Sequence, residues 1–557
     1  MPTVNTHTSH IITIFHQQIK RMCKQKHIYK VTPAIALPLW HWLRLTLLCL
    51  AMSACSLSQF SKADKPNANE EAGSQQPKTS NINIAPNKND LGAAPDETIY
   101  LISDINIGPK GSDPALFLKA NGSVFFSADD GIHGRELWKS NQSGSKVALV
   151  KDINTIKVDS PNTPNKTSSA FPSSLTELND TLMFAADNGI LGKELWKSDG
   201  TDAGTVLVKD INTATTPNNS SYPSYLTTIN GIAYFAANDG IHGNELWKSD
   251  GTTENTIMIK DIHVGAGDSS PTNLTNVNGI LYFSASDGVN GIEVWKSDGT
   301  EAGTVMVNNI NKSGHSLPNS FTQINDLIYF IANDGVYGKE LWQTDGTSIG
   351  TNIVKDINTS QGVNNGNGVV SELYNINNTL YFSANDTING TELWKSDGTY
   401  AGTVLVKDVN PGKGDAQPSG FTLLGSALLF AANDGSNGTE LWTSNGTATG
   451  TRLVKNINNN PNIKAGSSYP TALTTSNGKL YFAADDGSGL GEELWHSNGT
   501  MPGTTMIKNI SHDATINAGG SNPRDLIDIN GILFFSAYKK AIGRELFRID
   551  SSTTQKP

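Results

Sequence analysis

The chain has 557 residues, and only 17% of them are charged, whereas glycine alone contributes 53. Its net charge of −11 is uneven: residues 1–54 contain six basic and no acidic side chains, so the remainder carries 35 basic against 52 acidic residues. An acidic body lacks the clustered Lys and Arg that phosphate binding requires, which excludes nucleic acid as the expected partner. The only three cysteines, Cys23, Cys49 and Cys55, precede this body, so it has no disulfide.

The first 54 residues have the layout of an export signal. A basic segment, Lys20 to Lys30, precedes the apolar run from Leu45 to Ala54, which ends in small residues. Ten apolar or small residues are too few to span a bilayer, but they suit the hydrophobic region of a cleaved signal peptide. The alternative is a signal anchor that uses all of 34–54, which Arg44 interrupts. We therefore predict a signal peptide over 1–54.

The end of this segment resembles the lipobox of bacterial lipoproteins. The sequence Leu50-Ala51-Met52-Ser53-Ala54-Cys55 departs from the usual pattern in having Met52 where Leu is commonest. The resemblance implies that Cys55 is lipidated and becomes the mature N-terminus, and Ser56 after it implies sorting to an outer membrane. The alternatives are an ordinary secreted protein with an incidental cysteine and, for the start of the chain, Met22 instead of Met1.

Residues 55–97 are predicted to form a flexible polar tether. They are rich in Asn, Pro, Gln, Lys and Ser and have almost no large apolar side chain. Such a segment cannot bury enough apolar surface to offset its ordering entropy. We expect it to hold the following module away from a membrane, with which the protein makes contact only through the lipid anchor.

Most of the remaining chain repeats the phrase from Glu194 to Thr205 and its neighbours. Successive copies lie 47 to 58 residues apart, and a period near 50 is typical of a repeat architecture. The key aromatic residue of the nine copies falls at Trp138, Trp196, Trp247, Trp295, Trp342, Trp394, Trp442, Trp495 and Phe547.

Each copy predicts four short antiparallel strands. In one copy these are 223–229, 232–237, 245–249 and 256–261, and Asn230-Gly231 between the first two favours a type I′ turn. The second strand is almost continuously apolar, which indicates that both of its faces are covered. Four such strands per repeat are typical of a β-propeller blade.

We therefore predict an all-β chain with a propeller over 98–550 and a C-terminal tail over 551–557. Leu246 and Trp247 would point to opposite faces of a blade and contact the two neighbouring blades. The last copy lacks a fourth strand, and 98–106 matches the fourth-strand phrase, so the N-terminal strand would complete the last of about nine blades. The alternative is an open β-solenoid, which needs no such closure.

The intact phrase Glu-Leu-Trp-x-x-Asp-Gly-Thr resembles the ELWxxDGT-repeat family of bacterial extracellular proteins. It occurs at 194–201, 245–252, 340–347 and 392–399, and the resemblance covers about 98–550. Several copies depart from it, at Ser140-Asn141-Gln142-Ser143, Val294, Asn445, Asn498 and Phe547. The resemblance implies an exported, propeller-like repeat protein and offers no catalytic residues.

Two turns of each repeat carry aspartate. The aspartate of the second turn favours either a calcium site, because Ca²⁺ prefers clustered oxygen ligands, or simple turn chemistry, because Asp accepts backbone N–H groups. Turn chemistry is preferred, since each turn supplies only one or two carboxylates. The third-turn phrase Asp-Gly-Thr-x-x-Gly-Thr has the same two readings, with structure favoured more strongly. The second-turn residues are Asp130, Asp239, Asp287, Asp334, Asp386, Asp434 and Asp486.

No catalytic residues are predicted. Glu194 and its eight counterparts are expected to pair across strands with lysines such as Lys197 or Lys209, with a carboxylate ring as the alternative. The histidines stand in unlike places in different repeats, and no catalytic or phosphate-binding motif can be assembled from them. They are His133, His242, His263, His315, His496 and His512.

The long connections from each fourth strand to the next blade are where we expect binding. The longest, over 155–173, 213–221, 361–370 and 458–468, share a face with the second-strand turns, and variable loops on a rigid scaffold usually carry function. We predict a monomeric lipoprotein of the outer membrane or cell surface that binds or adheres to a protein or glycan through this face. The alternatives are a polysaccharide hydrolase or lyase and a calcium-stabilised envelope protein.

Overall fold

The structure is a computed structural model in which the described residues are 97–158, 166–214, 219–359, 366, 368–369, 371, 373–460, 466–511 and 519–550. The predicted signal peptide, Cys55, the tether before residue 97 and the C-terminal tail lie outside these ranges. The described residues form strands and turns, and none of their segments is a helix that could cross a membrane.

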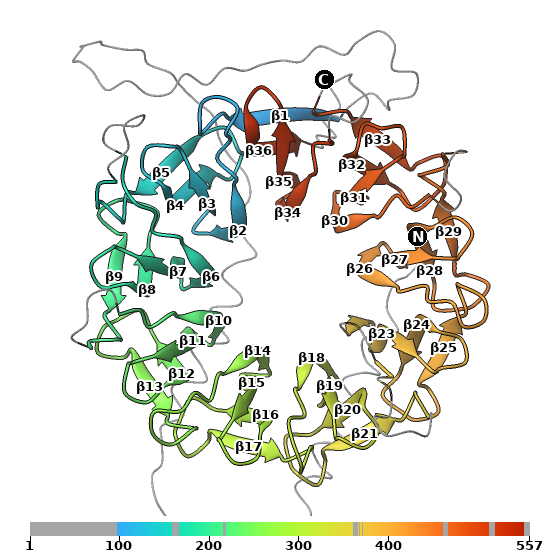
Figure 1. The fold of residues 1–557 in the computed structure, drawn as a ribbon, viewed down its shortest axis with the longest axis horizontal. Helices are drawn as coiled ribbons and strands as arrows, with labels where there is room; N and C mark the ends of the chain where they lie inside the picture. The colour runs from blue at the N-terminus through green and yellow to red at the C-terminus, as the bar shows by residue number, and fades with distance from the viewer. Residues whose placement is uncertain are drawn as a thin grey trace, which may run out of the picture. The chain divides into compact units, whose positions relative to one another are not determined.

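The described strands form nine four-stranded sheets, which we number as blades in chain order (Figure 1). Blades 1 to 3 are β2 (Ala115–Ala120), β3 (Ser123–Asp129), β4 (Arg135–Asn141) and β5 (Val147–Lys151); β6 (Ser173–Leu178), β7 (Thr181–Asp187), β8 (Lys193–Ser198) and β9 (Val206–Lys209); and β10 (Ser224–Ile229), β11 (Ile232–Asn238), β12 (Asn244–Ser249) and β13 (Ile257–Lys260). Blades 4 to 6 are β14 (Thr272–Val277), β15 (Ile280–Ser286), β16 (Ile292–Ser297) and β17 (Val305–Asn308); β18 (Asn319–Ile324), β19 (Leu327–Asn333), β20 (Lys339–Thr344) and β21 (Asn352–Lys355); and β22 (Tyr374–Ile376), β23 (Thr379–Asn385), β24 (Thr391–Ser396) and β25 (Val404–Lys407). Blades 7 to 9 are β26 (Ser419–Leu424), β27 (Ala427–Asn433), β28 (Thr439–Ser444) and β29 (Arg452–Lys455); β30 (Thr471–Ser476), β31 (Lys479–Asp485), β32 (Glu492–Ser497) and β33 (Thr505–Lys508); and β34 (Arg524–Ile529), β35 (Ile532–Lys539) and β36 (Gly543–Asp550) with β1 (Thr98–Ser103).

The ring is closed by the two ends of the propeller. β1 pairs antiparallel with β36, with Tyr100 opposite Arg548 and Leu101 opposite Phe547. The strands β2, β6, β10, β14, β18, β22, β26, β30 and β34 lie nearest the centre of the ring (Figure 1). In blades 1 to 8 the other strands follow outward in chain order, and in blade 9 β35 and β36 are followed by β1. The predicted nine-bladed propeller and its closure by the N-terminal strand are confirmed, and the open solenoid is wrong.

Packing between blades follows the predicted two-sided pattern. Phe235 on the second strand of blade 3 is fully buried. Leu246 belongs to the same apolar cluster as Trp295 of blade 4, whereas Trp247 packs with Met183 of blade 2. Because each blade buries both faces against its neighbours, the ring is stabilised without any disulfide.

The expected pairing of Glu194 with lysine is wrong. Glu194 is fully buried and accepts hydrogen bonds from Ile211 N and Ser221 N, both at 2.8 Å. Lys197 and Lys209 instead donate to backbone carbonyls of blade 3 at 2.9 and 2.7 Å. The carboxylate therefore ties the long loop to its own blade, because a buried charge requires several hydrogen-bond partners.

The same arrangement recurs in every blade. The nine glutamates are all fully buried, and each accepts backbone N–H groups from the loop that follows the fourth strand of its blade. They are Glu136, Glu194, Glu245, Glu293, Glu340, Glu392, Glu440, Glu493 and Glu545. We call this set the glutamate latches.

Candidate binding site

The first strands share a local geometry that shapes the wall around the centre of the ring. In blade 3 the strand is preceded by Ser221-Tyr222-Pro223, and Tyr222 has a φ of 49°. A second left-handed residue, Tyr225 with a φ of 57°, forms a β-bulge between the pairs Ser224–Ala236 and Thr227–Tyr234. Left-handed conformations are strained for residues with a Cβ and often mark ligand sites.

Blade 6 departs from this repeat. Eight blades have a proline seven positions before the first turn, such as Pro318 before Asn325 in blade 5, but blade 6 has valine at the equivalent position 370 before Asn377. β22 pairs with β23 at Tyr374, Asn375 and Ile376, and Ser371 Oγ accepts a hydrogen bond from Ser383 N at 2.8 Å.

Blade 6 also lacks a threonine that links first strands in other blades. Thr227 Oγ1 donates to Leu274 O of the next blade at 3.0 Å, and Thr422 Oγ1 to Leu473 O at 3.1 Å. The equivalent residue of blade 6 is Tyr374, which replaces the hydroxyl link with an aromatic ring. That ring packs against Phe421 of blade 7, with a centroid distance of 6.5 Å and an angle of 39° between the rings.

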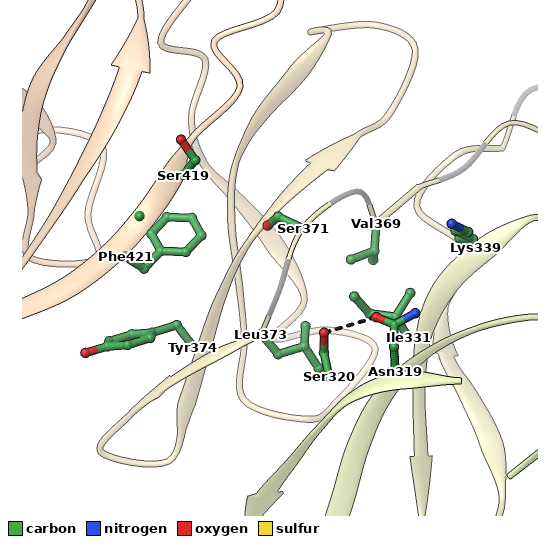
Figure 2. Close-up of a pocket in the computed structure, with 11 residues that line it drawn as sticks. Asn319, Ser320, Ile331, Lys339, Val369, Ser371, Leu373, Tyr374, Ser419 and Phe421 are labelled. Atoms are coloured by element: carbon green, nitrogen blue, oxygen red, sulfur yellow. Dashed lines mark hydrogen bonds between the residues drawn. The ribbon is translucent and has the colours of Figure 1, made fainter. Parts of the chain in front are cut away.

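A cavity opens where these departures meet. Its volume is about 620 Å³, and it lies between the first strands of blades 5, 6 and 7 (Figure 2). A second cavity of about 520 Å³ continues along the first strands toward blade 3 and shares Asn319, Ser320 and Leu373 with the first. Together they form what we call the channel groove, which extends from Tyr225 to Phe421.

The groove lies at the long-loop end of the ring. Ser371 and Val369 belong to the long connection that leads into β22, and Lys339 begins the strand that follows a second turn. In each blade the end of the second strand also touches this connection, as where Asn238 N donates to Ser221 O at 2.9 Å. This confirms that the long loops and the second turns share a face.

Uncharged polar groups, aliphatic side chains and aromatic rings make up the described lining of the groove, apart from one lysine. Ser320 Oγ donates to Asn319 Oδ1 at 3.0 Å, and Ser419 presents an exposed hydroxyl beside Phe421 (Figure 2). Lys339 is the one charged side chain among the described lining residues of the two cavities. The charge of the described lining is therefore positive, whereas residues 55–557 as a whole carry more acidic than basic side chains.

The second-turn aspartates act as turn residues in the structure. Asp434 Oδ1 accepts the N–H groups of Ser436 and Asn437 at 2.9 and 2.7 Å, and its Oδ2 accepts Asn437 Nδ2 at 2.7 Å. Equivalent bonds occur at the other described turns of this type. No group of three or more metal-binding side chains is found among the described residues, and calcium binding stays a prediction.

The third turn is also held by its own side chains. Asp199 Oδ1 accepts both the N–H and the hydroxyl of Thr201, at 2.8 and 2.7 Å, and Thr201 Oγ1 accepts Gly204 N at 2.9 Å. Ser198 Oγ and Thr205 Oγ1 lie 2.7 Å apart and are buried. These contacts give the phrase Asp-Gly-Thr-x-x-Gly-Thr a structural role.

The histidines serve several local contacts. His133 and His242 occupy equivalent second turns, and the Nδ1 of each lies 2.7 Å from an aspartate Oδ2, which corrects the expectation that all six stand in unlike places. His496 Nδ1 lies 2.5 Å from Glu97 Oε2 at the ring closure. His512 lies outside the described residues.

The long-loop face also exposes one aliphatic residue at the second turn of each of the first six blades. Their exposed fractions run from 55% for Ile132 to 86% for Val289. Blades 7 and 8 have Ser436 and Ser488 at this place. The six are Ile132, Ile190, Ile241, Val289, Val336 and Ile388.

No protein-family model matches the chain, and a search of curated proteins finds no match. Solved structures match it distantly, each with a TM-score of 0.36. One, from a study of two prolyl endopeptidases, is 10% identical, and the match covers 66% of this chain and 54% of that structure's chain. A puromycin hydrolase is 12% identical, and the match covers 80% of this chain and 61% of the hydrolase. A puromycin-hydrolyzing peptidase of Mycobacterium tuberculosis is 11% identical, and the match covers 78% of this chain and 59% of the peptidase. The match thus spans little more than half the length of those chains, and a similarity this distant says nothing about activity.

The sequence analysis missed the channel groove. Its signal in the sequence is two departures from the repeat of first strands, namely valine at position 370 in place of proline, and Tyr374 where six blades have threonine. These departures are visible only when the first strands are aligned with one another.

Proposed function

We propose that the protein is an exported, lipid-anchored envelope propeller that acts as a binding scaffold and holds its ligand in the channel groove. The observation that carries this proposal is that Tyr374 of blade 6 stands where six other blades have threonine, and that it lines the larger cavity together with Phe421. Departures from a local sequence rule tend to occur at functional sites, and Tyr374 departs from the repeat at the wall of this cavity.

The export part of the proposal rests on the sequence pattern before Cys55 and on the resemblance to ELWxxDGT-repeat proteins. It is tested by metabolic labelling with a radioactive fatty acid in cells that express the chain. We expect the label on the wild-type protein and none on Cys55→Ser, which should also leave the membrane fraction. A labelled Cys55→Ser variant would refute the anchor.

The binding part is tested by retention of the full chain, purified in detergent, on envelope fragments of the cells that produce it. Tyr374→Thr restores the residue of the other blades, so it should fold normally and lose retention. Equal retention of both proteins would show that the groove is not the binding site. The described residues that line the groove include no Asp or Glu. The retention experiment concerns binding alone and does not test the enzyme alternative.

A further inference from the structure

We infer that the ligand of the channel groove is a linear, hydroxyl-rich oligosaccharide, an inference that rests on the proposed function and names its substrate class. The argument depends on three properties of the groove, namely its aromatic corner, its polar lining and its extended course. Each is set by residues whose places in the repeat are known.

The aromatic corner supplies an apolar platform. Tyr374 and Phe421 lie on neighbouring blades and are tilted by 39°, and Phe421 is supported from behind by Phe430 at a centroid distance of 6.0 Å. Two rings at this angle present a concave apolar surface next to polar groups. A pyranose ring has one face of C–H bonds and an edge of hydroxyls, so it can cover the rings and still form hydrogen bonds.

The polar lining matches hydroxyls better than charges. Asn319, Ser320, Ser371 and Ser419 all border the cavity, and hydroxyl and amide groups both donate and accept hydrogen bonds. An acidic body with such a lining disfavours polyphosphates, which require clustered basic groups.

The course of the groove favours a chain over a single sugar. From the aromatic corner it continues past Asn273 and Thr275 to Tyr225, whose side chain is 52% exposed. Tyr225 therefore offers a second aromatic surface at the far end, held on a left-handed residue of a bulge. Two aromatic surfaces joined by a polar track suit an oligosaccharide with several residues.

The competing occupant is an extended polypeptide, which would pair with the free edge of a first strand. The two are separated with the full chain, purified in detergent, and envelope fragments that have been treated either with periodate, which cleaves vicinal diols, or with a protease. We expect periodate to abolish retention and the protease to leave it unchanged. Loss after the protease and survival after periodate would overturn the inference, while the binding scaffold itself would stand.

Variants locate the binding in the groove. Phe421→Leu introduces the residue that blades 3 and 8 carry, Leu226 and Leu473, so it should fold normally. We expect it and Tyr374→Thr each to lower affinity for the periodate-sensitive material about tenfold or more. Phe117→Leu, the same change outside the groove, should leave affinity unchanged. Equal affinities of all four proteins would refute the groove, and with it both the inference and the proposed binding function.

Discussion

Ser221 Oγ donates a hydrogen bond to Glu194 Oε2 over 2.6 Å, and both residues are almost completely buried. The serine lies at the end of the long loop and the glutamate on the third strand of the preceding blade, so this bond fixes the loop on which the binding face depends. Six of the nine latches have a serine at this place. The other three have Ala170, Gly368 and Ala416.

We expect Ser221→Ala to lower the free energy of unfolding by about 1.5–3 kcal/mol, because the change leaves a buried carboxylate with one donor fewer. The reverse change, Ala416→Ser, should supply the hydroxyl that Glu392 lacks and raise stability by about 1 kcal/mol. Urea denaturation followed by tryptophan fluorescence measures both. Ser436→Ala at an exposed turn is the matched control and should stay within about 0.5 kcal/mol of wild type. If Ser436→Ala and Ser221→Ala lower the free energy of unfolding equally, the hydrogen bond of Ser221 to Glu194 does not stabilise the fold specifically.

The raised pKa of the buried glutamates predicts that the free energy of unfolding falls as the pH rises. Burial raises the pKa of Glu136 and Glu392 to about 8, against the opposing effect of the backbone N–H donors, whereas the pKa of Glu194, which has its serine, is raised to about 7. The folded-state pKa lies above the unfolded value near 4.5, so these glutamates contribute to the free energy of unfolding through their protonated form. Their contribution is complete below pH 4.5 and is lost as the pH rises through 8.

The urea midpoint of the wild type should therefore decrease between pH 5.5 and pH 8.5. Glu136→Gln removes one titrating group and should make this decrease smaller. Asp202→Asn, at an exposed site whose carboxylate is 79% exposed, serves as the control and should leave the decrease unchanged. A midpoint that rises with pH in the wild type would contradict the prediction.

The ring closure has the opposite pH dependence. Glu97 lies just before β1 and contacts Lys479, and its Oε1 accepts the hydroxyl of Tyr481 at 3.0 Å. Burial alone would raise the pKa of Glu97, but the hydrogen bonds and charges of His496 and Lys479 outweigh it and lower the pKa to about 2. A lowered folded-state pKa means that this stabilisation is present above pH 4.5 and is lost as the pH falls through 2.

Glu97→Gln should therefore destabilise the closed ring by about 3 kcal/mol near pH 6, because it removes one partner of a largely buried ion pair. The difference from wild type should shrink as the pH approaches 2, where the wild-type carboxylate becomes neutral. Hydrogen exchange of β1 amides reports the closure directly. Glu254→Gln, on an exposed turn, is the control, and equal exchange of β1 in wild type and Glu97→Gln would show that Glu97 does not hold the ring closed.

The fold could be predicted from the sequence because its determinants are local and repeated. Each Asn-Gly turn has the positive φ values that type I′ turns require, as at Asn230 and Gly231 with 50° and 78°, and every second strand is buried on both faces. The role of Glu194 could not be predicted, since its partner Ser221 is 27 residues away and nearby lysines satisfy the cross-strand rule equally well. The channel groove could not be predicted from the repeat, because a substitution such as Tyr374 in place of threonine leaves the period of about 50 unchanged.

The second turns give the last prediction, which concerns metal removal. Because Asp434 already accepts two backbone N–H groups and one side-chain amide, we expect EDTA to leave the melting temperature unchanged within error. Asp434→Asn keeps an acceptor oxygen for the two N–H groups and should cost little, whereas Asp434→Ala removes it and should cost about 1–2 kcal/mol. If these turns hold calcium instead, EDTA will lower the melting temperature strongly. Asp434→Asn will then be nearly as harmful as Asp434→Ala, because a neutral amide replaces a charged ligand.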